Sequence, residues 1–130
     1  MKKLVLTLFT LCCMGMTFSQ IKTPQPSPSC TIKQTVGITE ITVNYSRPGA
    51  KDRAIFGELV PYNKIWRTGA NKATAITFES DVIFGETKVK KGTYSLFTVP
   101  GEREWVVMLN KETELWGAGN YNKEDEVASF

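Results

Sequence analysis

A period of two in apolar and polar side chains is the clearest pattern in the first half of the chain. In the segment ITEITVNYS, the residues Thr39, Ile41, Val43 and Tyr45 fall on one face, and polar residues separate them. Successive side chains of a strand point to opposite sides of a sheet, so this alternation predicts a strand with one buried face. An earlier strand is expected to open at Cys30, whose thiol we interpret as buried and inert.

Three later segments predict further strands because they are rich in β-branched and aromatic residues. These segments are ATAITFE (73–79), TYSLFTV (93–99) and EWVVMLN (104–110). TYSLFTV carries large side chains on both faces, which predicts a central strand that is covered on both sides. In EWVVMLN, Trp105 alternates with its neighbours, and we expect its indole to lie in the core.

Turn-forming sequences separate these segments: RPGAKD, RTGANK, FGET, KKGT and PGERE. Short strands with such turns between them predict an all-β fold, an antiparallel β-sandwich of jelly-roll-like type. One short helix is expected near residues 53–59, with Asp52 as its N-cap and Pro61 beyond its end. The chain reaches Phe130 where a further strand begins. The last segment is therefore either a loose tail or part of a domain that lacks C-terminal strands.

The N-terminal residues 1–19 have the layout of a secretory signal peptide, with two lysines, a short apolar run and then small residues. Cleavage is expected between Ser19 and Gln20. This interpretation predicts a periplasmic or secreted protein with no integral membrane segment in the mature chain. The alternatives are an uncleaved membrane anchor and a lipoprotein anchor at Cys12 or Cys13. The apolar run is shorter than the roughly 20 residues that span a bilayer.

The remaining chain is expected to have two parts. Residues 20–29 are rich in proline and predict an extended tether, and residues 30–130 predict a single domain. Cys30 is the only cysteine after residue 19, so no internal disulfide is available to the mature chain.

Charge gives no reason to expect a nucleic-acid partner. The formal net charge of the whole chain is +3, but Lys2 and Lys3 belong to the expected signal peptide. Without them, 14 of the 16 basic side chains remain against 13 acidic ones. Such a balance argues against electrostatic binding to nucleic acid or to an anionic membrane surface.

The chain has no histidine, and this excludes several kinds of active site. A Ser-His-Asp triad and the usual zinc sites cannot be built, and we predict no catalytic residue, no metal and no cofactor. Paired carboxylates could still serve a hydrolase. The available pairs, Glu102 with Glu104 and Glu112 with Glu114, flank turns, where solvated loop charges are the ordinary interpretation.

The stretch IWRTGANKAT places an indole next to a guanidinium. We expect Thr68–Lys72 to connect two strands as a hairpin, with Gly69 suited to a positive φ and Asn71 either in an Asx turn or in the left-handed conformation. Neighbouring side chains of a strand point to opposite faces. We therefore expect Trp66 to point inward and Arg67 to point outward, toward a cleft that the loops enclose.

The sequence closely resembles the DUF2911 family of exported proteins of unknown function, abundant in Bacteroidetes-type bacteria. The motifs that carry the resemblance are NYSRPGAKDRAIFGELVPYNKIWRTGANKATAITF, KKGTYSLFTVPGEREWVVMLNK and WGAGNY. The resemblance implies an exported β-rich domain and gives no activity or catalytic residue. It marks as signature residues Tyr45, Ser46, Arg47, Trp66, Arg67, Thr68, Asn71, Trp116 and Tyr121.

Three functions remain open from the sequence. The first is a non-catalytic binding or accessory module for a small or envelope-derived ligand, such as a glycan or another small molecule. Its candidate ligand-binding residues are Arg67, Arg47, Asn71, Thr68, Trp66, Tyr45, Trp116 and Tyr121, all of which could instead serve packing. The second is an interaction domain that pairs with a partner protein through an exposed sheet edge. The third is a carboxylate-based hydrolase.

Overall fold

The computed structural model describes residues 23–130, and this part of the chain is built from β-strands with one short 3-10 turn. The expected signal peptide at residues 1–19 lies outside the described residues. No helix in the described part of the chain is long and apolar enough to cross a membrane.

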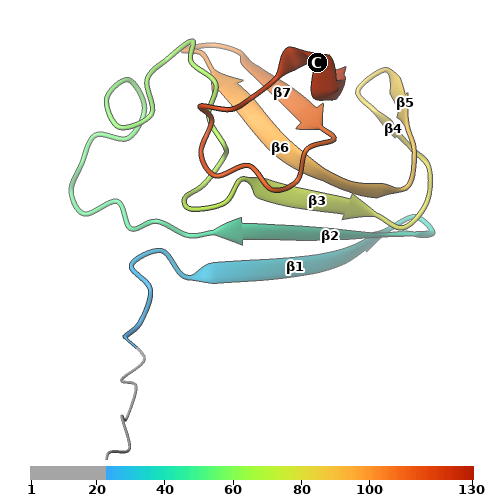
Figure 1. The fold of residues 1–130 in the computed structure, drawn as a ribbon, viewed down its shortest axis with the longest axis horizontal. Coiled ribbons are helices and arrows are strands. Elements are labelled where there is room, and N and C mark those ends of the chain that lie inside the picture. The colour runs from blue at the N-terminus through green and yellow to red at the C-terminus, as the bar shows by residue number, and fades with distance from the viewer. Residues whose placement is uncertain (1–22) are drawn as a thin grey trace, which may run out of the picture.

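Within residues 23–130, eight strands make up two antiparallel sheets, which confirms the all-β antiparallel fold class. The large sheet has the strand order β1-β2-β3-β6-β7-β8, and β4 pairs with β5 in a separate hairpin (Figure 1). The bounds are β1 (Ser29–Val36), β2 (Thr39–Ser46), β3 (Thr74–Phe78), β4 (Val82–Phe84), β5 (Thr87–Val89), β6 (Gly92–Pro100), β7 (Trp105–Asn110) and β8 (Glu126–Ser129).

The strands predicted from alternation are confirmed. β2 covers the segment in which Ile41, Val43 and Tyr45 share a face, and β6 lies inside the large sheet between β3 and β7. Side chains on both faces of β6 are buried, as the composition of TYSLFTV predicts; Phe97 and Thr98 point to opposite sides and are both almost fully enclosed. The sheet therefore carries two separate sets of packed side chains.

One face of the large sheet packs against the β4–β5 hairpin, and we call it the hairpin face. Cross-strand partners share a face, so the register places Leu96 and Leu109 on this side. Phe78, Val89, Leu109 and Ala128 form its buried centre. Figure 1 shows the hairpin curling over one end of the sheet. The second layer is thus small and covers only part of this face.

The opposite face packs against the segment 111–122, and we call it the loop face. Its buried cluster consists of Ala73, Phe97, Met108 and Leu115. Asn110 holds this segment in place, since its side-chain amide donates to the carbonyl oxygen of Asn122 at 2.9 Å and its Oδ1 accepts from the amide of Glu112 at 2.8 Å. Both polar groups of the fully buried Asn110 side chain are thereby satisfied.

The helix expected near residues 53–59 does not form, and the segment is instead a tight loop. Asp52 has a φ of 56°, whereas an N-cap residue needs an extended backbone. Gly57 has a φ of 90°, which is incompatible with a helix interior. The loop is closed where the amide of Val60 donates to the carbonyl oxygen of Ile55 at 2.7 Å. In Figure 1 this segment forms the small closed ring at the left.

Trp105 differs from the expectation that its indole lies in the core. It opens β7 at the end of the sheet beyond both buried clusters, and 41% of its surface is exposed. Its partner across the sheet is Pro100, the last residue of β6. The predicted alternation of β7 is nonetheless confirmed, because Leu109, which shares a face with Trp105, is buried.

Residues 126–129 form the edge strand β8 rather than a loose tail. Leu109 pairs with Ala128 and Met108 with Ser129. Beyond β8, Phe130 and Val107 exchange backbone hydrogen bonds of 2.8 and 3.1 Å. The Phe130 ring packs edge-on against Phe84 of the hairpin, with ring centroids 5.0 Å apart. The final residues therefore connect the large sheet to the hairpin.

Candidate functional site

The stretch from Trp66 to Thr74 is not a hairpin between two neighbouring strands. Its two ends pair with the same strand, β6, and the residues between them loop out of the sheet; we call this loop the excursion. Trp66 pairs with Thr98 of β6, and Thr74 pairs with Leu96 on the same side of β6. In an uninterrupted antiparallel strand, residue 68 would stand opposite Leu96. Thr74 stands there instead, so the chain leaves the sheet at Trp66 and returns six residues late. The hairpin expectation is wrong because both flanking segments pair with the same strand.

Side-chain and backbone hydrogen bonds close the neck of this excursion (residues 67–73). The amide of Thr74 donates to the carbonyl oxygen of Arg67 at 3.2 Å, and its hydroxyl donates to the carbonyl oxygen of Thr68 at 2.7 Å. The hydroxyls of Thr68 and Thr98 share a hydrogen bond of 3.1 Å. The excursion is therefore fixed to the sheet at its base.

Positive φ falls on Thr68 and Asn71 rather than on Gly69. Their φ values are 56° and 60°, so the left-handed conformation expected for Asn71 is confirmed, whereas the positive φ expected for Gly69 is not found. Gly69 serves a close approach instead. A Cβ at this position would lie 3.2 Å from both the carbonyl oxygen of Ser46 and the Oγ1 of Thr74. The excursion thus lies directly against the end of β2.

Asn71 ties the excursion to two other segments. Its Nδ2 donates to the carbonyl oxygen of Ser27 at 3.2 Å and to the Oγ of Ser46 at 3.3 Å. Ser46 ends β2 and Ser27 precedes β1, so one carboxamide connects three parts of the chain. This pattern gives Asn71 a structural role that the sequence did not indicate.

The loop that follows β2 is held by Arg53. Its Nε donates to the carbonyl oxygen of Ala50 at 2.9 Å, and its Nη2 donates to that of Gly49 at 2.7 Å. Two successive residues of this loop, Lys51 and Asp52, have positive φ. These two hydrogen bonds from one guanidinium satisfy the carbonyl groups of a tight turn and fix its position relative to the following ring.

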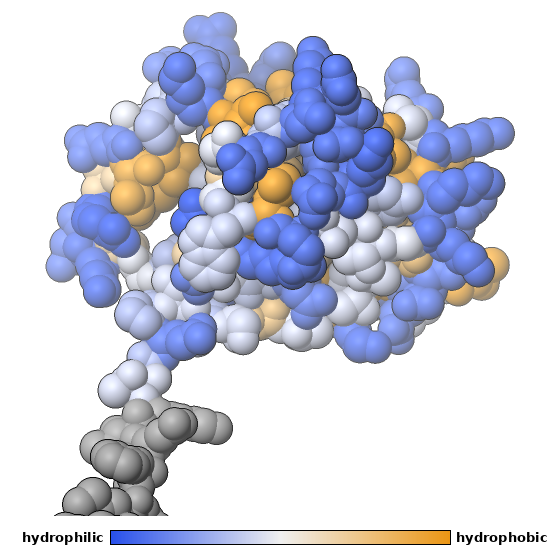
Figure 2. All heavy atoms as spheres, viewed as in Figure 1, coloured by the Kyte–Doolittle hydropathy of each residue, from blue (hydrophilic) through white to orange (hydrophobic). Residues whose placement is uncertain are grey.

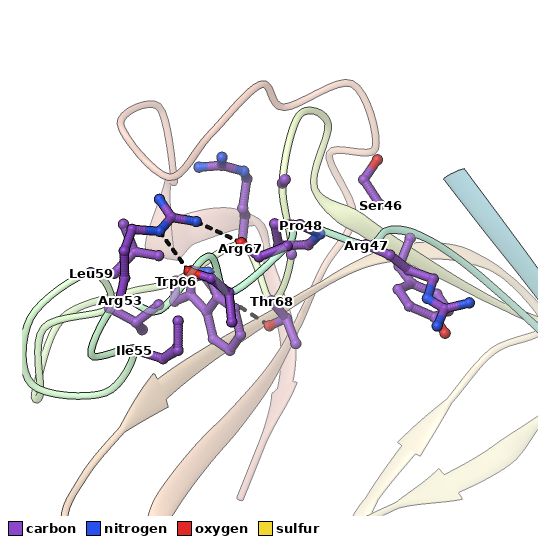
Figure 3. A pocket seen from close by; sticks show the side chains of 15 residues that line it. Ser46, Arg47, Pro48, Arg53, Ile55, Leu59, Trp66, Arg67 and Thr68 are labelled. Carbon is purple, nitrogen blue, oxygen red and sulfur yellow. Dashed lines mark hydrogen bonds between the residues drawn. The ribbon is translucent and has the colours of Figure 1, made fainter. Parts of the chain in front are cut away.

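A pocket of about 550 Å³ lies between the excursion, the loop after β2 and the ring at residues 54–60. Figure 3 shows Trp66, Ile55 and Leu59 gathered on one side of it and the segment from Ser46 to Pro48 on another. Apolar atoms make up most of its wall. Its lining residues are Tyr45, Ser46, Arg47, Pro48, Gly49, Ala50, Arg53, Ile55, Leu59, Val60, Trp66, Arg67, Thr68, Gly69 and Ala70.

Aromatic rings support the pocket from the hairpin face. Phe56, Trp66 and Trp105 meet edge to face, with ring centroids 5.0 to 6.3 Å apart. The Phe56 and Trp105 rings remain partly exposed. Figure 2 shows an apolar patch at the left, with hydrophilic side chains around it. The Trp66 indole is therefore held in one orientation at the base of the pocket.

Arg67 and Trp66 point to opposite sides, as their adjacency predicts, and Figure 3 shows this directly. The Nε of Arg67 is buried and has no hydrogen-bond partner among residues 23–130. A Cβ at Gly117 would lie 4.0 Å from its Nη1, so the guanidinium lies close to the segment 111–122. A second hollow of about 160 Å³, which Lys64 and Ala118 also line, adjoins the other side of Arg67.

The structure brings together five of the eight candidate residues. Tyr45, Arg47, Trp66, Arg67 and Thr68 all line the pocket. Two others, Asn71 and Trp116, line a separate hollow of about 280 Å³ with residues 25–27 and Ser46. The sequence missed the contributions of the loop and ring to the pocket, namely Arg53, Ile55, Leu59 and Val60. RPGAKDR was recognisable as turn chemistry, but nothing local indicates that it folds over Trp66.

Tyr121, the eighth candidate, lies apart from the pocket on the loop face. Its ring packs edge-on against Phe97 with centroids 5.0 Å apart, and its hydroxyl donates to Oε2 of Glu126 at 2.6 Å. Burial raises the pKa of the Tyr121 phenol well above its usual range, and the hydrogen bond to Glu126 raises it further. These contacts give Tyr121 a packing role.

The polar groups in the pocket lining are guanidinium, hydroxyl and backbone groups, and the lining contains no Asp or Glu. Within residues 23–130, no three carboxylate or thiol groups lie close enough to hold a metal ion. The carboxylate pairs noted in the sequence do not line the pocket. One of their members, Glu114, forms an ion pair with Lys72 at 2.6 Å. The Cys30 thiol, the cross-strand partner of Tyr45, raises the pKa of the Tyr45 phenol above its ordinary value.

Comparison with known proteins gives one match. No curated protein and no solved structure matches the chain. The family model described as "Protein of unknown function (DUF2911)" matches residues 27–130, which include all eight strands and the whole pocket lining. The chain belongs to the DUF2911 family.

Proposed function

We propose that this protein is a non-catalytic binding module for a small molecule with an apolar body, which it holds in the pocket beside Trp66. The observation that carries the proposal is the convergence of three separate segments on one hollow of about 550 Å³. Ligand pockets commonly measure about 300 to 1,000 Å³ and are mostly apolar with a few polar groups. We further propose that the protein meets this ligand in the periplasm or outside the cell, and the expected export signal supports this.

The pocket is pre-formed, which favours binding. Arg53 fixes the loop after β2, the neck of the excursion is closed by Thr74, and the indole of Trp66 is packed between two other rings. Little conformational freedom remains to be lost when a ligand enters, so apolar contact converts more fully into affinity.

Fluorescence of the neutral dye Nile red would test this function. The dye is expected to bind with a stoichiometry of one and to brighten in the apolar pocket. Leu59→Asp places a charge on the pocket wall and should weaken binding by about 10-fold or more, because a buried charge is costly beside an apolar ligand. Ile38→Asp is the matched control, since Ile38 is fully exposed in the turn after β1. Equal binding by the two variants would contradict the proposal.

A second candidate function is strand pairing through β1. This strand has eight residues, β2 is its only strand partner among residues 23–130, and its side chains are exposed on both faces, Ile32 by 48%. The amide of Arg47 donates to the carbonyl oxygen of Pro28. Because the pattern alternates, the amides of Thr31, Lys33 and Thr35 point away from β2. Such an edge can accept another strand.

Thr35→Pro would test edge pairing, because it removes an outward amide and keeps the bonds between β1 and β2. A wild-type protein that self-associates in sedimentation velocity, and a variant that is monomeric, would support pairing. A wild-type protein that remains monomeric and captures no strand peptide would rule it out.

A further inference from the structure

The pocket beside Trp66 is positively charged, and its charge is not neutralised. Three guanidinium groups line it, those of Arg47, Arg53 and Arg67, and the lining contains no Asp or Glu. The adjoining hollow adds Lys64 and again no carboxylate. The charged groups that line the two hollows are therefore all cations.

None of these four cations takes part in an ion pair with a described residue. The ion pairs of residues 23–130 are Lys33–Glu40, Lys72–Glu114, Lys90–Asp81 and Lys111–Asp125. None of the residues in these four ion pairs lines the pocket. A chain with nearly equal numbers of acidic and basic groups has thus left one concave surface without counter-charges.

Arg67 gives a second and independent indication. Its Nε is shut off from solvent and donates to no described residue. A buried N–H without a partner is unfavourable, and such groups are rare in folded proteins. Because Nε itself is enclosed, the guanidinium would have to turn toward the pocket for an acceptor supplied by a ligand to satisfy this donor. Carboxylate and phosphate oxygens are the acceptors that suit a guanidinium best, because they can take two parallel hydrogen bonds.

Arg53 lines the pocket together with Arg67. Its Nε and Nη2 are bonded to two backbone carbonyl groups, which orient the side chain but leave its charge uncompensated. Figure 3 shows the guanidinium groups of Arg53 and Arg67 on the same side of the pocket, while Arg47 extends away on the other side. Trp66, Ile55 and Leu59 supply apolar contact next to this pair.

We propose that the ligand of this pocket is an amphipathic anion, in which an apolar body lies against Trp66 and a carboxylate or phosphate head group binds Arg67 and Arg53. This inference rests on the proposed function and adds the charge of the ligand to it. It predicts that a neutral ligand of the same shape binds more weakly, and that a cationic one does not bind.

Displacement of Nile red by four ten-carbon amphiphiles would test the charge requirement, at concentrations below micelle formation. The four are decanoate, decyl phosphate, decanol and decyltrimethylammonium. Decanoate or decyl phosphate is expected to displace the dye about 10-fold more effectively than decanol, and added salt should reduce this difference. The more effective of the two anions identifies the head group. Decyltrimethylammonium should not displace the dye.

Variants of Arg67 locate the head group. Arg67→Met should remove the advantage of the anions over decanol while decanol still binds, and Arg67→Lys should retain only part of the advantage, because it keeps the charge and loses the Nε donor. Arg103→Met is the matched control, since Arg103 is exposed in the turn between β6 and β7 and lies outside the lining. Circular dichroism would establish that each variant is folded.

The possible failures are distinguishable. If decanol displaces the dye from the wild-type protein as well as the two anions do, the charge inference is wrong and the binding function stands. If neither the dye nor any of the four amphiphiles binds, the binding function itself is wrong. An anion advantage that Arg103→Met removes as fully as Arg67→Met would place the head group elsewhere and overturn the assignment.

Discussion

The phenol of Tyr121 donates a 2.6 Å hydrogen bond to the carboxylate of Glu126, the first residue of β8. Between these residues lies the short 3-10 turn at Lys123–Asp125, which Asn122 caps by accepting from the amide of Glu124. The bond closes a loop of the chain at the edge of the loop face. It also places a partly buried hydroxyl next to a negative charge, and this has a measurable consequence at alkaline pH.

The protein is expected to lose stability at alkaline pH through Tyr121. Burial and the neighbouring Glu126 raise the pKa of its phenol in the folded state above the ordinary value of about 10. The stabilising contribution is therefore fully present below about pH 10 and is lost as the pH rises toward the folded-state value. Urea unfolding across this range, combined with phenolate absorbance, would measure it.

Tyr121→Phe is the control for this effect. It should cost about 1.5 to 3 kcal/mol at neutral pH, since one hydrogen bond to a charged group is lost, and should make the alkaline decline shallower. An identical alkaline decline in the variant would show that other groups cause it.

Phe97→Ala and Trp105→Ala should differ in their effects on stability. Phe97 is fully buried in the loop-face cluster, so its replacement should cost about 3 to 5 kcal/mol. Trp105 is partly exposed and contributes mainly edge-to-face contacts with two rings, so its replacement should cost about 1 to 2 kcal/mol. Chemical denaturation of both variants would check the order, and a larger loss for Trp105 would contradict the structure.

Gly69→Ala should disturb the excursion although its backbone conformation is ordinary. The new Cβ would lie 3.2 Å from the carbonyl oxygen of Ser46, which cannot move without loosening β2. We expect a loss of about 1 to 2 kcal/mol. Gly119→Ala is the matched control, because a Cβ there would meet no heavy atom within 4 Å. Thermal unfolding would compare the two variants. Equal melting temperatures would contradict the close approach of Gly69 to Ser46.

The base of the β4–β5 hairpin should respond to acid through Asp81. Its carboxylate accepts from Nζ of Lys90 at 2.8 Å and from the amide of Lys91 at 2.9 Å, and these bonds lower its pKa. Its contribution is present above the unfolded pKa of about 4 and is lost as the pH falls through the lower folded value. In NMR, the Lys91 amide shift should titrate below about pH 4.

Asp81→Asn should abolish that titration, because the amide oxygen remains an acceptor but carries no ionisable proton. A Lys91 amide that still titrates in the variant would mean that another carboxyl group is responsible.

Much of the large sheet could be predicted from local sequence. Alternation identifies β2, and the two-sided apolar pattern of TYSLFTV identifies β6 as a central strand, because burial on each face depends only on side-chain direction. The hairpin strands β4 and β5 have three residues each, too few to show a period. The helix expected at residues 53–59 fails for a different reason. The positive φ of Asp52 and Gly57 depends on how the loop packs, which a propensity argument does not include.

The candidate site was predictable only in part. The opposed directions of Trp66 and Arg67 follow from their adjacency alone, and the structure shows them so. The pocket itself depends on contacts between distant segments, such as the approach of Gly69 to Ser46 and the position of Leu59 beside Trp66. No local pattern carries that information. The same limit explains why Asn71 and Tyr121 resembled ligand-binding residues, although their polar groups bond to other parts of the chain.

The excursion at residues 67–73 has a consequence for how this fold can change over time. It leaves and rejoins the sheet on the same side of β6, so residues can be inserted, deleted or replaced within it without shifting the register of any strand. A change in its length would therefore reshape the pocket wall, whereas Gly69 and Asn71 within it also hold the end of β2. Pocket shape and strand register are separately adjustable in such an architecture.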